Sequence, residues 1–227
     1  SAGLQKADSV QAVTKLEEFV PQLVRLSHPE VPALMQVEVN HVDQPMNASL
    51  DEEQSLTLEA DIGILTHRYL ELIANQGLAA WPITRLLPLR LAIQRWFTGQ
   101  GYAMAAANQG ADAVLSLLET TLESARGQWV LRYRESARNE WQVETLADSG
   151  LQVRKKIIDR TFIEDGVRWI VDYKTMAFES NADEAIWKLA AEQYRQQLEG
   201  YASLFIAEGL PIKLAVYFVS VGQLVTL

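Results

Sequence analysis

The 227-residue chain contains no cysteine. This absence excludes disulfides, thiolate zinc sites, iron–sulfur clusters and a cysteine nucleophile, and we expect a cytoplasmic protein. The sequence also lacks any run of about 18 uncharged apolar residues and any basic-then-apolar leader. It therefore predicts neither a membrane span nor a secretion signal. The chain begins Ser-Ala-Gly rather than with methionine, from which we expect a piece of a longer polypeptide.

Positive charge is also scarce. The formal net charge is −9, although 48% hydrophobic and 22% charged residues make an ordinary globular composition. Residues 1–60 hold ten acidic and three basic residues, whereas residues 151–176 hold six basic and four acidic residues. Strong free-standing DNA binders carry far more positive surface. A domain of this charge that acts on DNA would need something else to deliver the strand.

The N-terminal half of the chain has the pattern of helices. Residues 1–55 contain a proline-interrupted helical stretch and a polar, proline-containing stretch, and we interpret them as a peripheral or linking segment that is partly helical. From Leu58 the apolar residues recur at helical spacing. The predicted helical part is 58–127, with helices at 60–77, 83–101 and 111–127 that each end in glycine.

After Gly127 the apolar period changes from 3.6 towards two residues. The alternation predicts four strands, at 128–135, 140–147, 151–164 and 167–175, with turns at DSG and EDG. A long amphipathic helix at 182–208 is stopped by Gly209, and strands at 212–221 and 223–227 end the chain. The prediction is a mixed α/β domain, with a central mixed sheet flanked by helices and an N-terminal helical region.

Charged residues interrupt the apolar stretch IIDRTFIEDGVRWIVDYKT, residues 157–175. A charge removed from water costs several kcal/mol unless it is paired or binds a metal. Asp172 and Lys174 are two apart and share a strand face, and the EDG turn brings Asp159 back towards them. Neighbouring carboxylates repel unless a cation bridges them, and Mg²⁺ favours one or two carboxylates plus waters and phosphate oxygens. The alternative is ordinary ion pairing of both aspartates with Arg160, Arg168 and Lys174 at the strand edge.

The same stretch resembles the core of the PD-(D/E)XK nuclease superfamily, specifically its RecB/AddA type, which shows IDR followed after a turn by DYKT. Three further strings follow the family's chain order, namely GILTHRYLE (63–71), ARNEWQVE (137–144) and YRQQLEGYASLF (194–205). The resemblance implies a restriction-endonuclease-like domain at 56–227, with its core sheet and helix at 128–227. The chain departs from the family at VRKKIIDR, where a glycine often precedes IDR.

The resemblance implies a role for each matching residue. His67, Asp159 and Asp172 would bind the metal, Mg²⁺ or Mn²⁺, and the backbone carbonyl of Tyr173 would add a ligand. Lys174 would be the catalytic lysine, and Glu140 would act through water or by aligning Lys174. The residues expected to contact DNA or to support the ligands are Gln197, Tyr201, Arg160 and Thr175.

Structural roles remain open for several of these residues. A histidine on an apolar helical stripe, such as His67, is usually a packed core residue. Glu140 is equally consistent with a solvated strand position. Tyr201 shares a helical stripe with Tyr194, Leu198 and Phe205, which is typical of a core-facing side chain.

The resemblance implies a Mg²⁺-dependent deoxyribonuclease, an exonuclease that hydrolyses single strands or duplex ends during double-strand-break repair and recombination. Because the sequence lacks a G-x-x-x-x-G-K-[ST] phosphate loop, the ATP-driven helicase motor would lie elsewhere in a longer chain or in a partner subunit. Two alternatives stay open. One is a catalytically silent nuclease-fold module that binds DNA or a partner subunit, and the other is a restriction or junction-resolving nuclease of the same superfamily.

Overall fold

The computed structural model describes residues 50–134, 136–146 and 153–227. The predicted peripheral segment lies outside these residues, except for its last positions, which form the start of helix α1 (Leu50–Gln76). This helix begins earlier than the predicted residue 58. None of the described helices is long and apolar enough to cross a lipid bilayer.

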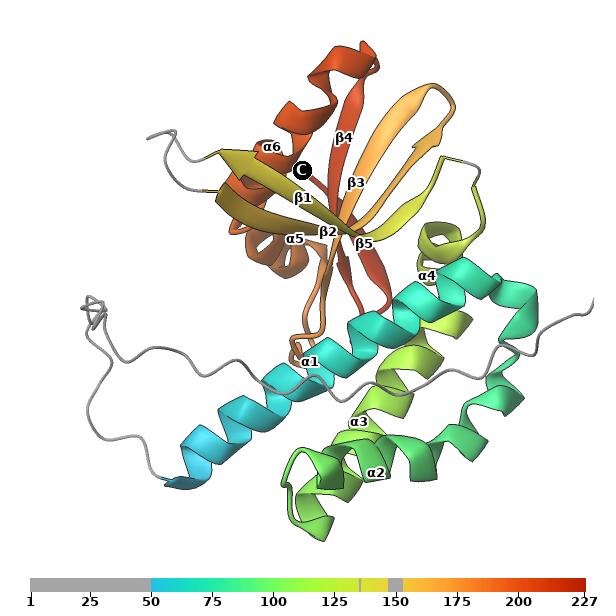
Figure 1. The fold of residues 1–227 in the computed structure, drawn as a ribbon, viewed down its shortest axis with the longest axis vertical. Helices are drawn as coiled ribbons and strands as arrows, with labels where there is room; N and C mark the ends of the chain where they lie inside the picture. The colour runs from blue at the N-terminus through green and yellow to red at the C-terminus, as the bar shows by residue number, and fades with distance from the viewer. Residues whose placement is uncertain (1–49, 135, 147–152) are drawn as a thin grey trace, which may run out of the picture. The chain divides into compact units, whose positions relative to one another are not determined.

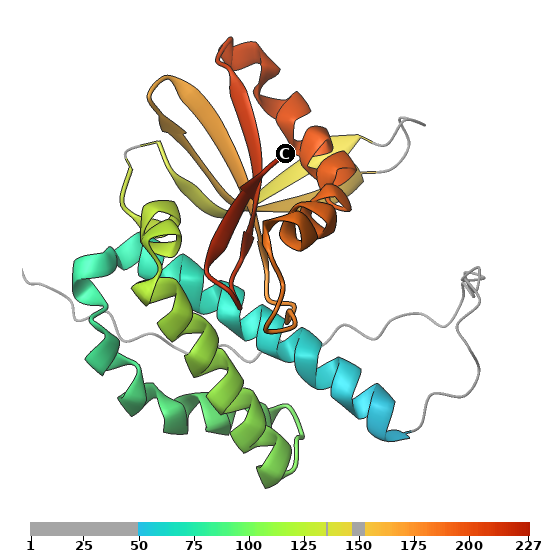
Figure 2. The same ribbon diagram turned by 180° about the vertical axis from the view of Figure 1, so that it is seen from behind.

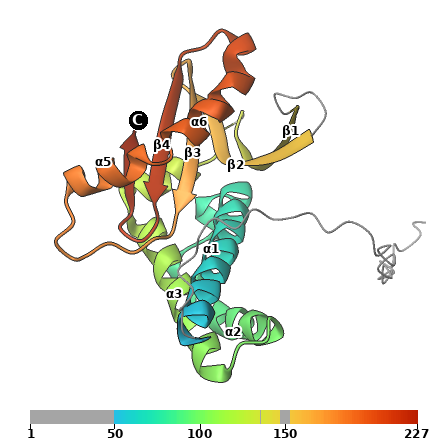
Figure 3. The same cartoon turned by 90° about the vertical axis from the view of Figure 1, so that its left-hand side faces the viewer.

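Helices α1, α2 (Arg90–Gly99) and α3 (Met104–Glu123) pack together beside the sheet (Figures 1 and 3). Along α3 the buried residues recur every three or four positions, the spacing of a single helix face. Gly110 on α3 allows close packing against α2, because a Cβ there would lie 2.7 Å from the ring of Phe97. The predicted helical region is therefore a bundle held by one apolar seam.

The predicted helix at 83–101 is shorter than expected. Its first part forms two 3₁₀ turns, η2 (Ile83–Arg85) and η3 (Leu87–Leu89), and another turn, η1 (Leu78–Ala80), precedes them. Pro88 lacks the N–H that an α-helix would use at that position. The α-helix consequently begins only at Arg90.

The predicted strand at 128–135 is wrong, because residues 128–131 belong to helix α4 (Ala125–Leu131). The side chain of Ser124 accepts hydrogen bonds from the N–H groups of Arg126 and Gly127, which caps the helix. Gly127, read from the sequence as a helix stop, is instead required inside α4. A Cβ at this position would lie 2.2 Å from the carbonyl oxygen of Thr121.

The described strands form one five-stranded sheet in the order β1-β2-β3-β4-β5. Neighbouring strands are antiparallel except for the parallel pair β3–β4. The prediction of a mixed α/β fold with a mixed sheet flanked by helices is therefore confirmed. The strands are β1 (Arg138–Leu146), β2 (Val153–Glu164), β3 (Val167–Lys174), β4 (Ile212–Phe218) and β5 (Gln223–Thr226).

Helices cover both faces of the sheet. Val171 and Tyr217 belong to a core shared with α1–α4, whereas Ile170 and Val216 belong to a core shared with the two C-terminal helices. Because successive strand residues point to opposite faces, the two cores lie on opposite sides of the sheet. Figure 2 shows the C-terminal helices from behind.

The single helix predicted at 182–208 is divided into three parts. Helix α5 (Glu184–Glu192) is followed by α6 (Arg195–Ala202) and by the 3₁₀ turn η4 (Ser203–Glu208). The break follows Ala191, which is buried against the sheet, and allows α6 to bury Leu198 and Tyr201. The end of the segment agrees with the prediction, because Gly209 has a φ of 68° and closes the last turn.

Candidate metal centre

The site lies where strand β2 separates from strand β3. The β2–β3 ladder ends at the pair Arg160 and Val171, although β2 continues to pair with β1. At the next position, Oδ2 of Asp159 accepts a hydrogen bond of 2.6 Å from the N–H of Tyr173. The Asp159 carboxylate therefore satisfies a backbone donor that would otherwise lack a strand partner.

Glu140 lies opposite Asp159 on strand β1. The β1–β2 pairs on either side are Asn139 with Arg160 and Trp141 with Ile158, so Glu140 and Asp159 occupy the same register position. Glu140 has a φ of 44°, which is left-handed and unusual for a residue with a side chain. Strain of this kind costs about 1–3 kcal/mol and persists where the surrounding structure holds it.

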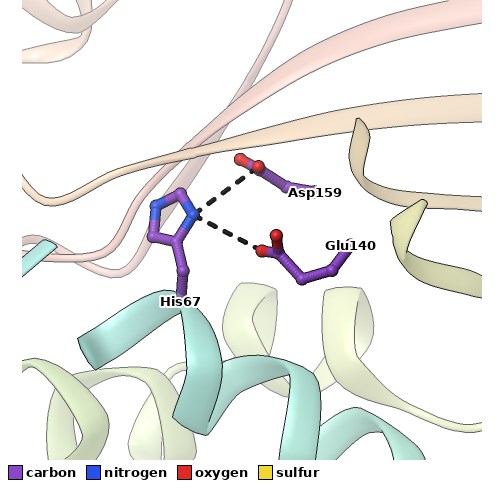
Figure 4. Close-up of side chains that lie close together, drawn as sticks. All are labelled: His67, Glu140 and Asp159. Atoms are coloured by element: carbon purple, nitrogen blue, oxygen red, sulfur yellow. Dashed lines mark ion pairs between the residues drawn. The ribbon is translucent and has the colours of Figure 1, made fainter. Parts of the chain in front are cut away.

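His67 reaches the two carboxylates from helix α1 (Figure 4). Its Nδ1 lies 3.5 Å from Oδ1 of Asp159 and 3.7 Å from Oε1 of Glu140. One ligand atom from each residue lies within 4.8 Å of the others, which is compatible with a shared metal ion. The ring packs edge-on against Tyr173 at a centroid distance of 5.6 Å, which fixes its orientation.

The protonation of His67 depends on the carboxylates. Burial of the ring lowers its pKa, but the hydrogen bonds and charges of Asp159 and Glu140 outweigh burial and raise the pKa to about 10. The imidazolium thus supplies a positive charge between two carboxylates. A metal ion at this position would replace that positive charge and would require the neutral ring.

Asp172 lies beside this group but does not belong to the set within 4.8 Å, which differs from the predicted ligands His67, Asp159 and Asp172. Its Oδ2 lies 2.7 Å from Nζ of Lys174. Burial and the charge of Asp159 raise the pKa of Asp172 to about 6, against the opposing effects of Lys174 and His67. The described structure thus brings Glu140 to His67 and Asp159, and the role of Asp172 as a metal ligand stays a prediction.

Lys174 and helix α6 surround Asp172. The Nε2 of Gln197 lies 3.3 Å from Oδ1 of Asp172 and donates a 2.8 Å hydrogen bond to the hydroxyl of Tyr201. The Lys174 ammonium also lies 4.3 Å from the ring centroid of Tyr194, a cation–π contact that the sequence interpretation missed. The sequence could have indicated this contact, because Tyr194 precedes Gln197 by three residues and so lies on the same helical stripe.

A cavity of about 670 Å³ opens over the centre. Its lining includes His67, Glu140 and Lys174, together with Thr175. Thr175 Oγ1 would lie 3.3 Å from a Cβ at Gly63 of α1, so glycine there allows close approach. The cavity is large enough for a substrate group above the ligands.

Two residues predicted to belong to the site, Arg160 and Tyr173, make other contacts in the structure. Arg160 is not part of the cavity lining, and its guanidinium instead donates to Asn139 and to the carbonyl of Arg132. The Tyr173 N–H is bonded to Asp159, while the role of its carbonyl as a ligand stays a prediction. Neither a protein family model nor a curated protein sequence matches this chain.

Proposed function

We propose that residues 56–227 form a metal-dependent DNA nuclease domain of the RecB/AddA type. The observation that carries the proposal is the convergence of His67, Glu140 and Asp159 from one helix and two strands, with the Lys174–Asp172 pair beside them. These residues are far apart in the sequence. Four short strings that resemble the nuclease family in chain order supply the residues that meet at this point.

The donor atoms fit a divalent cation. Oε1 of Glu140 is buried, and among the described residues it faces only Nδ1 of His67, at 3.7 Å, so a lone pair remains for a ligand. Two carboxylates with an imidazole suit Mg²⁺ with its waters, or Mn²⁺. When bound, such an ion polarises a phosphate oxygen and lowers the pKa of water. His67, Glu140 and Asp159 would hold it, with Asp172 adjacent.

Lys174 is the proposed catalytic lysine. It lines the cavity, and its ammonium is held by Asp172 and by the ring of Tyr194. A fixed positive charge at this point neutralises negative charge that develops on a phosphate and orients the attacking water. Burial lowers the pKa of Lys174, but Asp172 outweighs burial and the net shift is upward, so the ammonium stays charged.

The surrounding residues hold these groups in place. The Tyr173 N–H fixes one oxygen of Asp159, which leaves the other oxygen towards His67. Gln197 contacts Asp172 while it donates to Tyr201, so helix α6 orients the carboxylate that orients Lys174. Positioning of this kind by hydrogen-bonded partners is a usual requirement of a metal site.

The proposed substrate is DNA, delivered as a single strand or as a duplex end by an ATP-dependent helicase. Residues 56–227 hold 17 basic and 20 acidic residues, which is consistent with delivery by a motor, because the domain lacks the excess of positive charge that supplies non-specific affinity. The motor would lie in a longer chain or in a partner subunit. Such a domain would serve as an exonuclease in double-strand-break repair and recombination.

The direct test is Mg²⁺-dependent digestion of end-labelled single- and double-stranded DNA. Wild-type protein should shorten the single strand with Mg²⁺ and not with EDTA, whereas Lys174→Met and Asp172→Asn should lose cleavage while remaining folded. Lys188→Met is the matched control, because Lys188 is exposed on α5 and pairs there with Glu184, one turn away on the same helix. Cleavage that persists in both site variants would reject the proposal, and a folded wild-type protein that neither cleaves nor binds metal would favour a silent nuclease-fold module.

A further inference from the structure

A second polar pocket, of about 80 Å³, lies next to the candidate metal centre. Its polar lining comes from Asn75 of α1, Asn139 of β1, Arg160 of β2, and Tyr133 and Arg134 of the α4–β1 connection. We infer that this pocket binds a phosphate group of the nucleic-acid strand, away from the bond that is cut. The inference rests on the proposed nuclease function and adds a strand-binding subsite to it.

The first support is the buried charge of Arg160. Its side chain is 0% exposed, and it donates to the side-chain oxygen of Asn139 and, at 2.8 Å, to the carbonyl of Arg132. Its Nε is buried without a hydrogen-bond partner. Within the described residues no carboxylate forms an ion pair with it. An unpaired buried charge is costly. An anion would therefore stabilise a buried guanidinium whose described acceptors are all neutral.

The pocket also carries an excess of positive charge. Arg132 and Arg134 both pair with a single carboxylate, that of Glu164. Burial lowers the pKa of Arg134 to about 10, and the charges of Arg132 and Arg160 add to this effect while Glu164 opposes it. Among the described residues, Arg132 and Arg134 thus share one acid, and the charge of Arg160 acts on the same group. A phosphate would relieve their mutual repulsion and accept the planar donors of arginine.

Tyr133 identifies the anion as part of a nucleic-acid strand. It lies between two arginines in the sequence and lines the pocket, yet the residue is 76% exposed. An exposed aromatic ring beside a phosphate-binding group is the arrangement that binds an unpaired base by stacking. A free inorganic anion would make no use of the ring.

The pocket and the metal centre are built from the same three elements, β1, β2 and α1. Asn139 adjoins Glu140 on β1, and Arg160 adjoins Asp159 on β2. On α1, Asn75 follows His67 by eight residues, a rise of about 12 Å along the helix. A strand of a few nucleotides can span this separation. The phosphate could be an internal one or a terminal one.

Asn75→Asp is the most specific variant. Oδ1 of Asn75 accepts a 2.7 Å hydrogen bond from Nδ2 of Asn139, and an aspartate would keep this acceptor while it adds a negative charge to the pocket. Asn75 is exposed, so the fold should tolerate the change. Gln100→Glu adds the same charge at an exposed position after α2 and is the matched control. Tyr133→Ala removes the ring alone.

The experiment measures binding of fluorescently labelled 12-nucleotide oligothymidine to the full 227-residue chain in EDTA, by fluorescence anisotropy. The oligonucleotides carry a 5′-phosphate, a 3′-phosphate or no terminal phosphate. Asn75→Asp and Tyr133→Ala should each weaken binding by about 5- to 100-fold, whereas Gln100→Glu should leave it unchanged. A preference for one phosphorylated end would assign a terminal phosphate, and equal binding of the three would assign an internal one.

Two results would overturn the inference. One is wild-type binding that neither Asn75→Asp nor Tyr133→Ala weakens, and the other is the absence of measurable wild-type binding. Because EDTA removes divalent metal, the assay does not depend on cleavage. A protein that binds through this pocket but fails to digest DNA with Mg²⁺ would contradict the proposed nuclease and leave the strand-binding subsite supported.

Discussion

Glu140 lies directly opposite Asp159 across strands β1 and β2, and it does so with a left-handed backbone, at a φ of 44°. The neighbouring residues on both strands are paired, while these two are not. Both carboxylates approach the same nitrogen of His67. The strained residue of β1 is thus also the one that supplies a donor to the candidate metal centre, as expected where local strain serves a site.

Because of this strain, glycine should be more stable than alanine at position 140, the reverse of the usual order within a strand. Both Glu140→Gly and Glu140→Ala lose the carboxylate, but only glycine adopts a positive φ without a steric penalty. Glu140→Gly should therefore be more stable than Glu140→Ala by about 1 kcal/mol in urea unfolding. At Gln142, two residues along β1 and regularly paired, alanine should be the more stable substitution. Equal preferences at the two positions would show that Glu140 is unstrained in solution.

Loss of a metal carboxylate should abolish metal binding more completely than loss of a supporting residue. Removal of an outer hydrogen-bond partner typically weakens metal binding by about 10–100-fold. Asp159→Asn should therefore weaken Mn²⁺ binding by more than about 100-fold, as measured by calorimetric titration. Asp165→Asn is the control, because Asp165 is exposed in the β2–β3 turn at a φ of 52°, which asparagine tolerates. Similar affinities for the two variants would exclude Asp159 as a ligand.

Metal binding should release a proton from His67. With a pKa of about 10, the ring is protonated at pH 7.5, and a metal ligand must be neutral. The affinity for Mn²⁺ should consequently increase by about tenfold for each unit by which the pH is raised, up to about pH 10. Titration at pH 7.5 in two buffers of different ionisation enthalpy should report close to one proton released. His67→Gln should release about none, and an equal release from both proteins would contradict the assignment.

Asp172 should make the metal-free protein less stable as the pH rises from about 4 to about 6. Its pKa is raised to about 6 from the ordinary value of 3.8, so across this window the folded state binds more protons than the unfolded state. Stability then falls with pH, by up to about 1.4 kcal/mol per unit. Asp172→Asn lacks this dependence. Urea unfolding in EDTA should show that the free energy of unfolding of Asp172→Asn, relative to that of the wild type, increases from pH 4.5 to pH 6.5. An unchanged difference between the two proteins would contradict the raised pKa of Asp172.

Much of the site follows from local sequence pattern. Alternating apolar residues and the Asp165–Gly166 turn predict the β2–β3 hairpin, and the structure has this turn at φ values of 52° and 74°. The helical spacing around His67 predicts α1. Local patterns suffice here because hairpin pairing and helix faces depend on residues that are close in the chain.

The remaining features depend on contacts between distant residues. The left-handed φ of Glu140 and its position opposite Asp159 arise from the β1–β2 register, which no short string reveals. Residues 128–131 have an apolar pattern that fits a strand or a helix, and the cap by Ser124 decides for the helix. The side chain of Ser124 is itself held by a 2.6 Å hydrogen bond to the carbonyl of Gly222, almost 100 residues later.

The central claim is that one divalent cation binds between His67 and the carboxylates of β1 and β2. Crystals grown with Mn²⁺ and measured for anomalous scattering test it most directly. We predict one peak within about 2.0–2.6 Å of a His67 ring nitrogen and an Asp159 oxygen, with Glu140 or Asp172 adjacent. A protein that digests DNA with Mn²⁺ while its crystals show the ion elsewhere, and His67 still paired with Asp159, would contradict the account.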